Sequence, residues 1–306
     1  MKFRTAYIFL AALVVLSACN KKPTIYDGRI YYTVRQAGDF RIEWMDETGG
    51  NVHYVMGVIP KHDELEIIGD EEAQKKAAEK LTQQARHPSV SRDGKKMAYL
   101  CGSPASIRIY DLALDKEELN IDSKESYYCP RFSPLSNTTL VYMRTGEDKP
   151  SQILVHDYTK KPVIIRTAKR VAVPCWSNYN TIYYVEYDAT NRPFLISSPP
   201  NEDGNKKANR KIVLENVSDV AVAPSGSQLA VVLDGKLCVY DPRSEKTREV
   251  CSSLKNISSP SWNPAGTKIA FVSDENLYVV DAMGDKPVMI NDPFKKVQDV
   301  CWAVGF

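Results

Sequence analysis

The sequence has 306 residues, of which 43% are hydrophobic and 25% are charged, and its formal net charge is +2. This is the composition of an ordinary globular protein, and a charge so close to zero excludes a global field that would attract nucleic acid. The 17 tyrosines and the many valines and isoleucines favour β-strands.

The first residues predict an export signal. Lys2 and Arg4 give a positive start, and an apolar run from Ala6 to Leu16 follows. This run is shorter than the about 20 apolar residues that a membrane-spanning helix needs. A short apolar run that ends in small residues is typical of a signal peptide.

Residues 16–19 read Leu-Ser-Ala-Cys and resemble the lipobox of bacterial lipoproteins. The resemblance implies cleavage before Cys19 and acylation of its sulfur and of the new amino group. Each buried CH₂ of an acyl chain contributes about 0.8 kcal/mol, so two or three chains give stable anchoring. The alternatives are a plain secretory signal with a coincidental cysteine, or an uncleaved anchor. On the lipoprotein interpretation, residues 1–18 are the signal peptide.

Residues 19–27 then form a short tether to the membrane. Lys21 and Lys22 are not the acidic pair associated with retention in the inner membrane of enterobacteria. The resemblance therefore implies a lipid-anchored protein of the bacterial envelope, at the outer membrane and facing the periplasm. Loss of Lys2 and Arg4 with the signal peptide would leave the mature chain neutral.

A repeat of 40–46 residues covers most of the remaining chain. Each copy begins with a strand that carries one large apolar residue, and three more runs rich in Val, Ile, Phe and Tyr follow. The aligned large residues are Val90, Phe132, Trp176, Val222, Trp262 and Trp302. Gly94, Gly226 and Gly266 stand where a tight turn between the first two strands needs positive φ. Four short strands at this period are typical of a β-propeller blade.

The last copy stops four residues after Trp302. Three strands without an inner partner stand at the other end of the chain, at 28–34, 40–46 and 52–59. We expect strand 297–304 to join them and complete blade one, which removes the open edge of the ring. The sequence therefore predicts an all-β fold over residues 28–306, a six-bladed β-propeller with four-stranded blades.

The most regular copy reads PSWNPAGTKIAFVSDENLYVVD, from Pro260 to Asp281. It resembles the P-x-W-S-P-D-G-K-x-I-A-F motif of WD40-like (PD40) repeats, which occur in the C-terminal domain of TolB and in propeller domains of peptidases. The resemblance covers about residues 28–306 and implies a TolB-like six-bladed β-propeller lipoprotein. It says little about function, and the sequence has no G-x-S-x-G motif of a serine peptidase.

One insertion interrupts the repeats at about residues 70–86. Asp70 is a plausible N-cap, and Glu71–Lys75 and Glu72–Lys76 are favourable i,i+4 pairs. We expect a short helix that joins blades one and two. It would be a partner-binding helix, a cap on the channel mouth or a solvated connector.

The seven cysteines suggest one disulfide. Cys19 is assigned to lipid, and a hairpin centred between Ser244 and Glu245 would put Cys238 directly opposite Cys251. Facing residues in such a pair come close to disulfide distance. A one-residue change of register would remove the pairing and leave two buried thiols. No cysteine or histidine spacing suggests zinc.

The sequence contains no recognisable catalytic motif, and we predict no cofactor, no metal and no nucleic-acid partner. Residues at or just before the inner strands are candidates for a channel mouth that binds a peptide tail or a small ligand. They are Arg86, His87, Tyr127, Tyr128, Asp219 and Asp299. The alternative is an ordinary water-lined channel wall.

These observations favour a non-catalytic, lipid-anchored propeller that serves as a protein-interaction or glycan-binding platform. Its partners would be the membrane, through Cys19, and a protein of unknown identity. The alternative is a propeller enzyme, a lyase or hydrolase that acts on a saccharide through a site in the channel.

Overall fold

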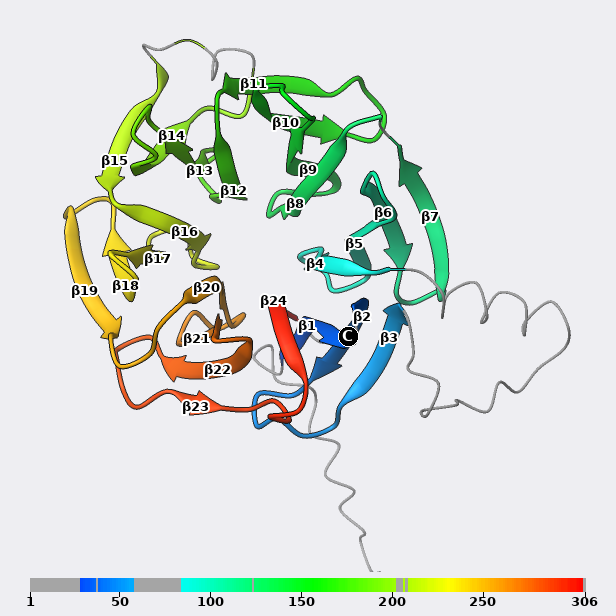
Figure 1. The fold of residues 1–306 in the computed structure, drawn as a ribbon, viewed down its shortest axis with the longest axis vertical. Helices are drawn as coiled ribbons and strands as arrows, with labels where there is room; N and C mark the ends of the chain where they lie inside the picture. Colours follow the sequence, from blue (N-terminus) through cyan, green and yellow to red (C-terminus); the bar gives the residue numbers. More distant parts are fainter. Residues whose placement is uncertain are drawn as a thin grey trace, which may run out of the picture.

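The computed structural model describes residues 28–36, 38–57, 84–122, 124–201, 206 and 209–304. They form six four-stranded antiparallel sheets arranged around a central axis (Figure 1). The predicted six-bladed β-propeller is therefore confirmed.

Each blade runs from an inner strand at the axis to an outermost strand at the rim. In this order, blade one contains β24 (Lys296–Val304), β1 (Gly28–Gln36), β2 (Asp39–Met45) and β3 (His53–Gly57). Blade two contains β4 (Arg86–Val90), β5 (Lys96–Cys101), β6 (Ser106–Asp111) and β7 (Lys116–Ile121). Blade three contains β8 (Ser126–Ser133), β9 (Ser136–Thr145), β10 (Ser151–Asp157) and β11 (Val163–Ala168).

The second half of the ring follows the same order. Blade four contains β12 (Val171–Trp176), β13 (Ile182–Tyr187), β14 (Pro193–Ser198) and β15 (Lys211–Glu215). Blade five contains β16 (Val217–Val222), β17 (Leu229–Leu233), β18 (Lys236–Asp241) and β19 (Lys246–Cys251). Blade six contains β20 (Ile257–Trp262), β21 (Lys268–Ser273), β22 (Asn276–Asp281) and β23 (Val288–Met289).

The turns after the inner strands have the conformation that their sequences predict. Gly94, Gly226 and Gly266 have φ of +76°, +75° and +71°. In blade four, which has no glycine there, Asn180 takes the left-handed conformation with φ of +56°. Asparagine tolerates this region better than most residues, so the turn keeps its shape without glycine.

The hydrophobic core lies between the blades. Six clusters of buried residues each join strands of two neighbouring blades. The large residue of each repeat packs in or against one of these clusters, and Trp262 and Trp302 are 4% and 6% exposed. The aromatic residues of the repeat therefore hold neighbouring blades together.

The ring closes between the two ends of the described chain. β1 pairs with β24 from Gly28 opposite Val304 to Arg35 opposite Lys296. A Cβ atom on Gly28 would lie 2.6 Å from the indole nitrogen of Trp302, so only glycine fits this contact. The predicted completion of blade one by the C-terminal strand is confirmed.

Two predictions lie wholly or mostly outside the described residues. The signal peptide and tether (residues 1–27) lie outside them, and so does most of the insertion predicted to be helical. Of that insertion, Gln84 and Ala85 are not helical, and Arg86 begins β4. Within the described ranges, no helix is long and apolar enough to cross a membrane.

The predicted Cys238–Cys251 disulfide is wrong. The β18–β19 turn is centred one residue earlier than expected, because the Asp241 side chain accepts hydrogen bonds from the N–H groups of Arg243 and Ser244. Cys238 therefore faces Glu249, and a β-bulge puts Cys251 opposite Leu237. Both thiols are free. They pack in different clusters, one between blades four and five and one between blades five and six.

Candidate functional site

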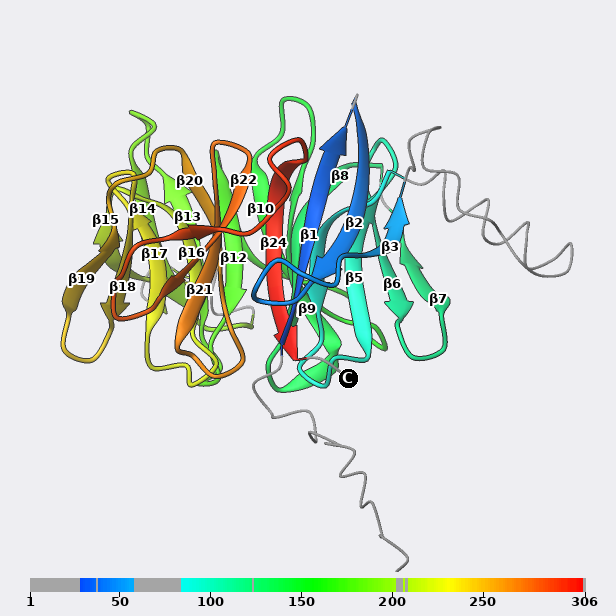
Figure 2. The ribbon, with the colours of Figure 1, turned by 90° about the horizontal axis from the view of Figure 1, so that it is seen from below.

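The six inner strands β4, β8, β12, β16, β20 and β24 surround the central axis of the ring (Figures 1 and 2). A pocket lies at each end of this axis, and we call the space along the axis the channel. We name each face of the ring after a residue that lies at its opening. The arginine face carries the turns that follow the inner strands, including Arg92. On the histidine face the inner strands begin, next to His87. Since β1 begins opposite the end of β24, Gly28 lies on the arginine face.

A hydrogen bond from a backbone N–H links each inner strand to a side chain of its neighbour, at all six blade junctions. At three junctions the acceptor is an oxygen atom. The Ser89 hydroxyl accepts from Phe132 N–H at 3.2 Å, and the Ser261 hydroxyl accepts from Trp302 N–H at 2.8 Å. The Asp219 side chain accepts from Ser259 N–H at 2.7 Å. The sulfur acceptors are Cys129, for Val173 N–H; Cys175, for Val222 N–H; and Cys301, for Val90 N–H.

The three channel thiols are structural. Burial raises the pKa of Cys129 and of Cys175 to about 12, and it also raises the pKa of Cys301. A nucleophilic cysteine needs a lowered pKa. These thiols therefore accept hydrogen bonds as protonated side chains and are not suited to attack a substrate.

Two blades depart from this pattern, and one departure supplies a channel charge. In four blades the acceptor is the residue directly before the large residue of the repeat, namely Ser89, Cys175, Ser261 and Cys301. The same position is held by Arg131 in blade three and by Ala221 in blade five. At those two junctions the residue two places earlier, Cys129 or Asp219, accepts the hydrogen bond instead. The Arg131 side chain therefore takes no part in the junction contact.

The histidine side of the channel holds the acidic groups. The His87 Nδ1 and Asp299 Oδ1 atoms are 2.8 Å apart, and Asp299 is 7% exposed. Burial disfavours its carboxylate, but His87 and Arg131 nevertheless hold the pKa of Asp299 below its ordinary value. Burial raises the pKa of Asp219 to about 6, although Ser259, Val220 and Arg131 act in the opposite direction.

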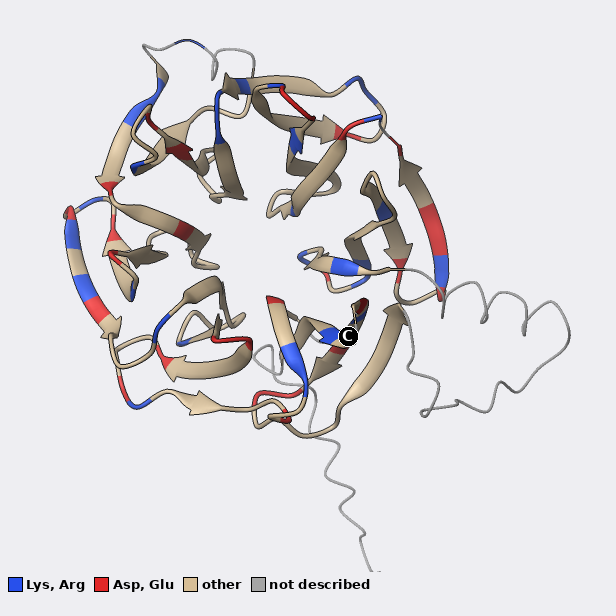
Figure 3. Ribbon diagram, viewed as in Figure 1, with Lys and Arg blue, Asp and Glu red and all other residues tan. Residues whose placement is uncertain are grey.

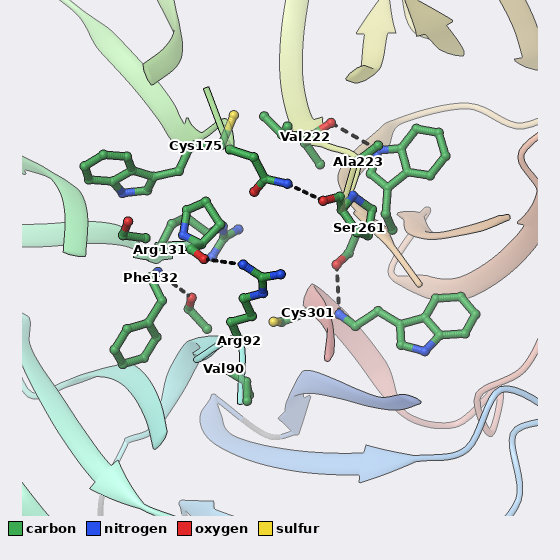
Figure 4. Close-up of a pocket in the computed structure, with 18 of the residues that line it drawn as sticks. Val90, Arg92, Arg131, Phe132, Cys175, Val222, Ala223, Ser261 and Cys301 are labelled. Atoms are coloured by element: carbon green, nitrogen blue, oxygen red, sulfur yellow. Dashed lines mark hydrogen bonds between the residues drawn. The ribbon is translucent and has the colours of Figure 1, made fainter. Parts of the chain in front are cut away.

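The opening on the arginine face is a cavity of about 250 Å³, which we call the arginine cavity (Figure 4). All six blades contribute to its lining, and Arg92 and Arg131 are the charged residues among those that line it. Arg92 comes from the β4–β5 turn, and its Nη1 donates to the Pro134 carbonyl at 3.1 Å. Among the described lining residues there is no aspartate or glutamate, so this cavity is basic.

The opening on the histidine face has a different character. Its pocket of about 420 Å³ is lined by His87 and Asp299 together with residues of blade six, including Asp274 and Glu275. Part of this acidic charge is compensated, because Glu275 pairs with Lys296 at 2.8 Å. The channel thus has one basic and one predominantly acidic opening.

The structure separates the six predicted channel-mouth residues. His87 Nδ1 and Asp299 Oδ1 lie 2.8 Å apart at the histidine opening, and the Asp219 side chain accepts a hydrogen bond from the next blade. Tyr127 lies in the core between blades two and three, with its ring 5.0 Å from that of Tyr142.

The other two predicted residues lie at the starts of their strands. The Arg86 guanidinium lies over the Phe40 ring of blade one at 5.4 Å. Tyr128 is half-buried near the start of β8. Their proposed role in ligand binding stays a prediction.

Sequence reasoning missed Arg92 and Arg131. A signal was present, because Arg131 is the one charged residue among the six that directly precede the aligned large residues. Arg92 gave a weaker signal, since it stands in a turn where a solvated charge is usual.

Neither a metal site nor a single-sign surface emerges from the described part of the chain. Within it, no group of three or more His, Cys, Asp or Glu side chains is placed to hold a metal ion. Lys and Arg alternate with Asp and Glu around the ring (Figure 3).

The fold and channel define a six-bladed β-propeller with a hydrogen-bonded inner ring and one basic opening. A family model, the dipeptidyl peptidase IV N-terminal region, matches residues 219–293. Comparison with curated protein sequences finds no significant match.

Solved structures show which propellers it is similar to. TolB from Acinetobacter baumannii matches with a TM-score of 0.68 and 15% identity, over 91% of this chain and 67% of TolB. A putative TolB from Agrobacterium tumefaciens matches with a TM-score of 0.63 and 14% identity, over 89% and 91%. An oligogalacturonate lyase in complex with manganese matches with a TM-score of 0.54 and 14% identity, over 86% and 73%. The chain therefore has a TolB-like propeller fold.

Proposed function

We propose that the protein is a lipid-anchored, non-catalytic β-propeller of the bacterial envelope that binds a carboxylate-bearing segment of a partner protein in the arginine cavity. One observation carries the proposal: two arginines enter a cavity that all six blades line and that has no acidic residue among its described lining. The export signal and lipobox supply the location, and the TolB-like fold is consistent with it.

Arginine suits a carboxylate ligand because its planar guanidinium carries five N–H donors and binds carboxylates in a bidentate manner. Arg92 uses one donor on Pro134, and Arg131 donates to the carbonyl of Pro130 at 3.1 Å. The other donors of the two side chains can therefore bind a ligand.

The size of the cavity favours part of a larger ligand. Pockets for small molecules usually have about 300–1,000 Å³, and the arginine cavity has about 250 Å³. An acidic side chain or a chain end inserted from a larger partner fits this volume better than a complete cofactor or an oligosaccharide.

The ionisable groups of the channel support binding over catalysis. Asp219 and the three thiols are used in blade junctions, and Asp299 is paired with His87. A general acid or base must be accessible to its substrate. The saccharide-enzyme alternative would instead use the His87–Asp299 pair at the other opening.

Photo-crosslinking in native membranes tests the proposal. A photoreactive amino acid at Asn178, which lines the arginine cavity, should form a protein adduct, whereas one at the exposed Lys124 on the histidine face should not. Arg92→Gln should lower the adduct yield about tenfold, since a charged hydrogen bond contributes about 1.5–3 kcal/mol. A circular dichroism melting curve checks that the variant is folded.

Three results would contradict this proposal. They are equal adducts at both positions, an adduct with a saccharide in place of protein, or a yield unchanged by Arg92→Gln. The anchor is tested separately by mass spectrometry of the N-terminal peptide, where an unmodified Cys19 would rule out lipidation.

A further inference from the structure

Two facing sides of the arginine cavity present apolar side chains. The aligned large residues of blades two and five are valines, Val90 and Val222, and both line the cavity as half-buried side chains. In the other four blades this position holds an aromatic residue that packs between blades and is at most 9% exposed. The valines lie on β4 and β16, which face each other across the ring (Figure 1). The cavity therefore has apolar surface on two opposite sides.

Two serines add hydrogen-bond donors to the same cavity. Ser89 and Ser261 both line it, and each hydroxyl oxygen accepts an N–H from the next inner strand. A hydroxyl can also donate its own hydrogen. Within the described chain, no side chain or backbone group accepts the O–H of either serine. Both O–H groups are therefore available to a ligand.

The donors of the cavity match one kind of ligand group. Two guanidinium groups and two hydroxyls line the cavity, and no carboxylate stands among its described lining. A carboxylate has two oxygen atoms with about four acceptor positions, and hydrogen bonds to a charged acceptor are stronger than those between neutral groups. The cavity thus places a carboxylate-binding set of donors beside apolar surface.

A C-terminal residue combines the two features that this lining requires. Its α-carboxylate and its side chain leave the same Cα atom, so both can enter one small cavity. In an internal aspartate or glutamate the carboxylate ends the side chain, and no separate apolar group accompanies it. A chain end also enters along the axis of the ring as one segment, whereas an internal loop must enter and leave. Capture of a terminal carboxylate is a common way to recognise a peptide.

We propose that the arginine cavity binds the C-terminal residue of the partner protein and prefers an apolar side chain there, an inference that rests on the proposed carboxylate-binding function of this cavity. The two arginines bind the α-carboxylate, and the two serine hydroxyls donate to its oxygen atoms. The terminal side chain packs against the valines. The proposal thus replaces a general acidic segment by a chain end with a defined chemistry.

Fluorescence polarisation with peptide pools tests this inference on the full-length lipidated protein in detergent micelles. The fluorescent peptides are random mixtures of uncharged residues that end in valine, leucine or phenylalanine, each made as the free acid and as the amide. Another pool has an amidated end and one internal glutamate. The acid pools should bind at least about tenfold more tightly than the amide pools, because amidation removes the charged acceptor. Acid pools that end in serine or lysine should bind more weakly than the apolar ones.

A matched variant separates the hydroxyl donor from the blade junction. Cys175 and Cys301 hold the position of Ser261 in blades four and one and make the same junction contact. Ser261→Cys therefore keeps the junction but replaces the O–H by an S–H, which is a weak donor. The acid pools should bind about fivefold more weakly or worse, and an unchanged thermal midpoint checks the fold. Val222→Thr should reduce the preference for an apolar last residue.

The outcomes distinguish this inference from the proposed function. Equal binding of acid and amide pools, or acid binding that Ser261→Cys leaves unchanged, would overturn the inference. Selective binding of the internal-glutamate pool that Arg92→Gln abolishes would overturn the chain-end inference and support the carboxylate site. If no pool distinguishes the parent from Arg92→Gln, the inference and the proposed function both fail.

Discussion

The residue directly before each large apolar residue determines how the channel wall is joined. Serine or cysteine at this position accepts an N–H from the next inner strand, as Ser261 and Cys175 do. Arginine has no acceptor, so the junction after Arg131 is made by Cys129 instead. A single residue type at one repeat position therefore decides whether a blade contributes structure or charge to the channel.

Asp219 should make stability depend on pH. Its pKa is raised to about 6 by burial, from an ordinary value near 4. The fold favours the protonated form, so its contribution is fully present below about pH 4 and is lost as the pH rises through about 6. Urea unfolding should show a decrease of up to about 3 kcal/mol over this range, which Asp219→Asn should abolish.

The effect of Asp299 on stability has the opposite pH dependence and falls in a lower pH range. Its pKa is lowered by its charged neighbours, so its contribution is lost only as the pH falls below about 4. Parallel pH profiles for the parent and Asp219→Asn between pH 4 and 7 would contradict the assignment to Asp219.

At the level of the strand, β-bulges shape the channel. The register of β4, β8, β12 and β20 shifts at His87, Cys129, Val173 and Ser259, which have φ between +48° and +53°. Positive φ is unfavourable for residues other than glycine, above all for β-branched valine. Bulges increase the local twist, which inner strands converging on one axis need.

The end of β3 requires glycine. Gly57 has φ of +114°, and an added Cβ would lie 2.4 Å from the Cα of Arg41. Gly57→Ala should lower the free energy of unfolding by roughly 3 kcal/mol or more, as measured by urea denaturation. Gly235→Ala is the matched control, because Gly235 also has positive φ but no atom within 4 Å of the added Cβ. It should lose only about 1–2 kcal/mol, and equal losses would contradict the steric argument.

Strands and turns were predictable where the sequence pattern is local. They were less predictable where a side chain replaces a backbone group as the hydrogen-bond partner. In blade six the outermost strand is short, and β23 ends at Met289. Asn291 Oδ1 instead accepts the N–H of Leu277 at 2.8 Å. The disulfide failed for a similar reason, because the Asp241 side chain sets the turn between the two cysteines.

For the whole molecule, closure of the ring depends on the last strand. Trp302 of β24 packs in the cluster between blades six and one. Trp302→Ala should cost about 3–5 kcal/mol. Phe294→Ala, in the connection between β23 and β24 and 91% exposed, should change stability by no more than about 0.5 kcal/mol. Similar midpoints for the two variants in thermal unfolding would show that blade one does not need this contact.

The repeat period predicted the architecture because each blade buries its residues against the next copy of the same pattern. The channel was predicted only in part. His87 and Asp299 meet because both stand three residues before an aligned large residue, in neighbouring blades. The arginine cavity was missed because its residues lie about 40 positions apart and become a group only when the ring is closed. No local pattern distinguishes Arg92 from a solvated turn residue.

The pairing of β1 with β24 has a consequence for biogenesis. β1 is made long before its partner β24. During synthesis, the first three strands must wait for about 240 further residues before β24 is available, and their free edge can pair with another chain in that time. A chain that stops before residue 296 lacks β24, so the edge of β1 would stay unpaired.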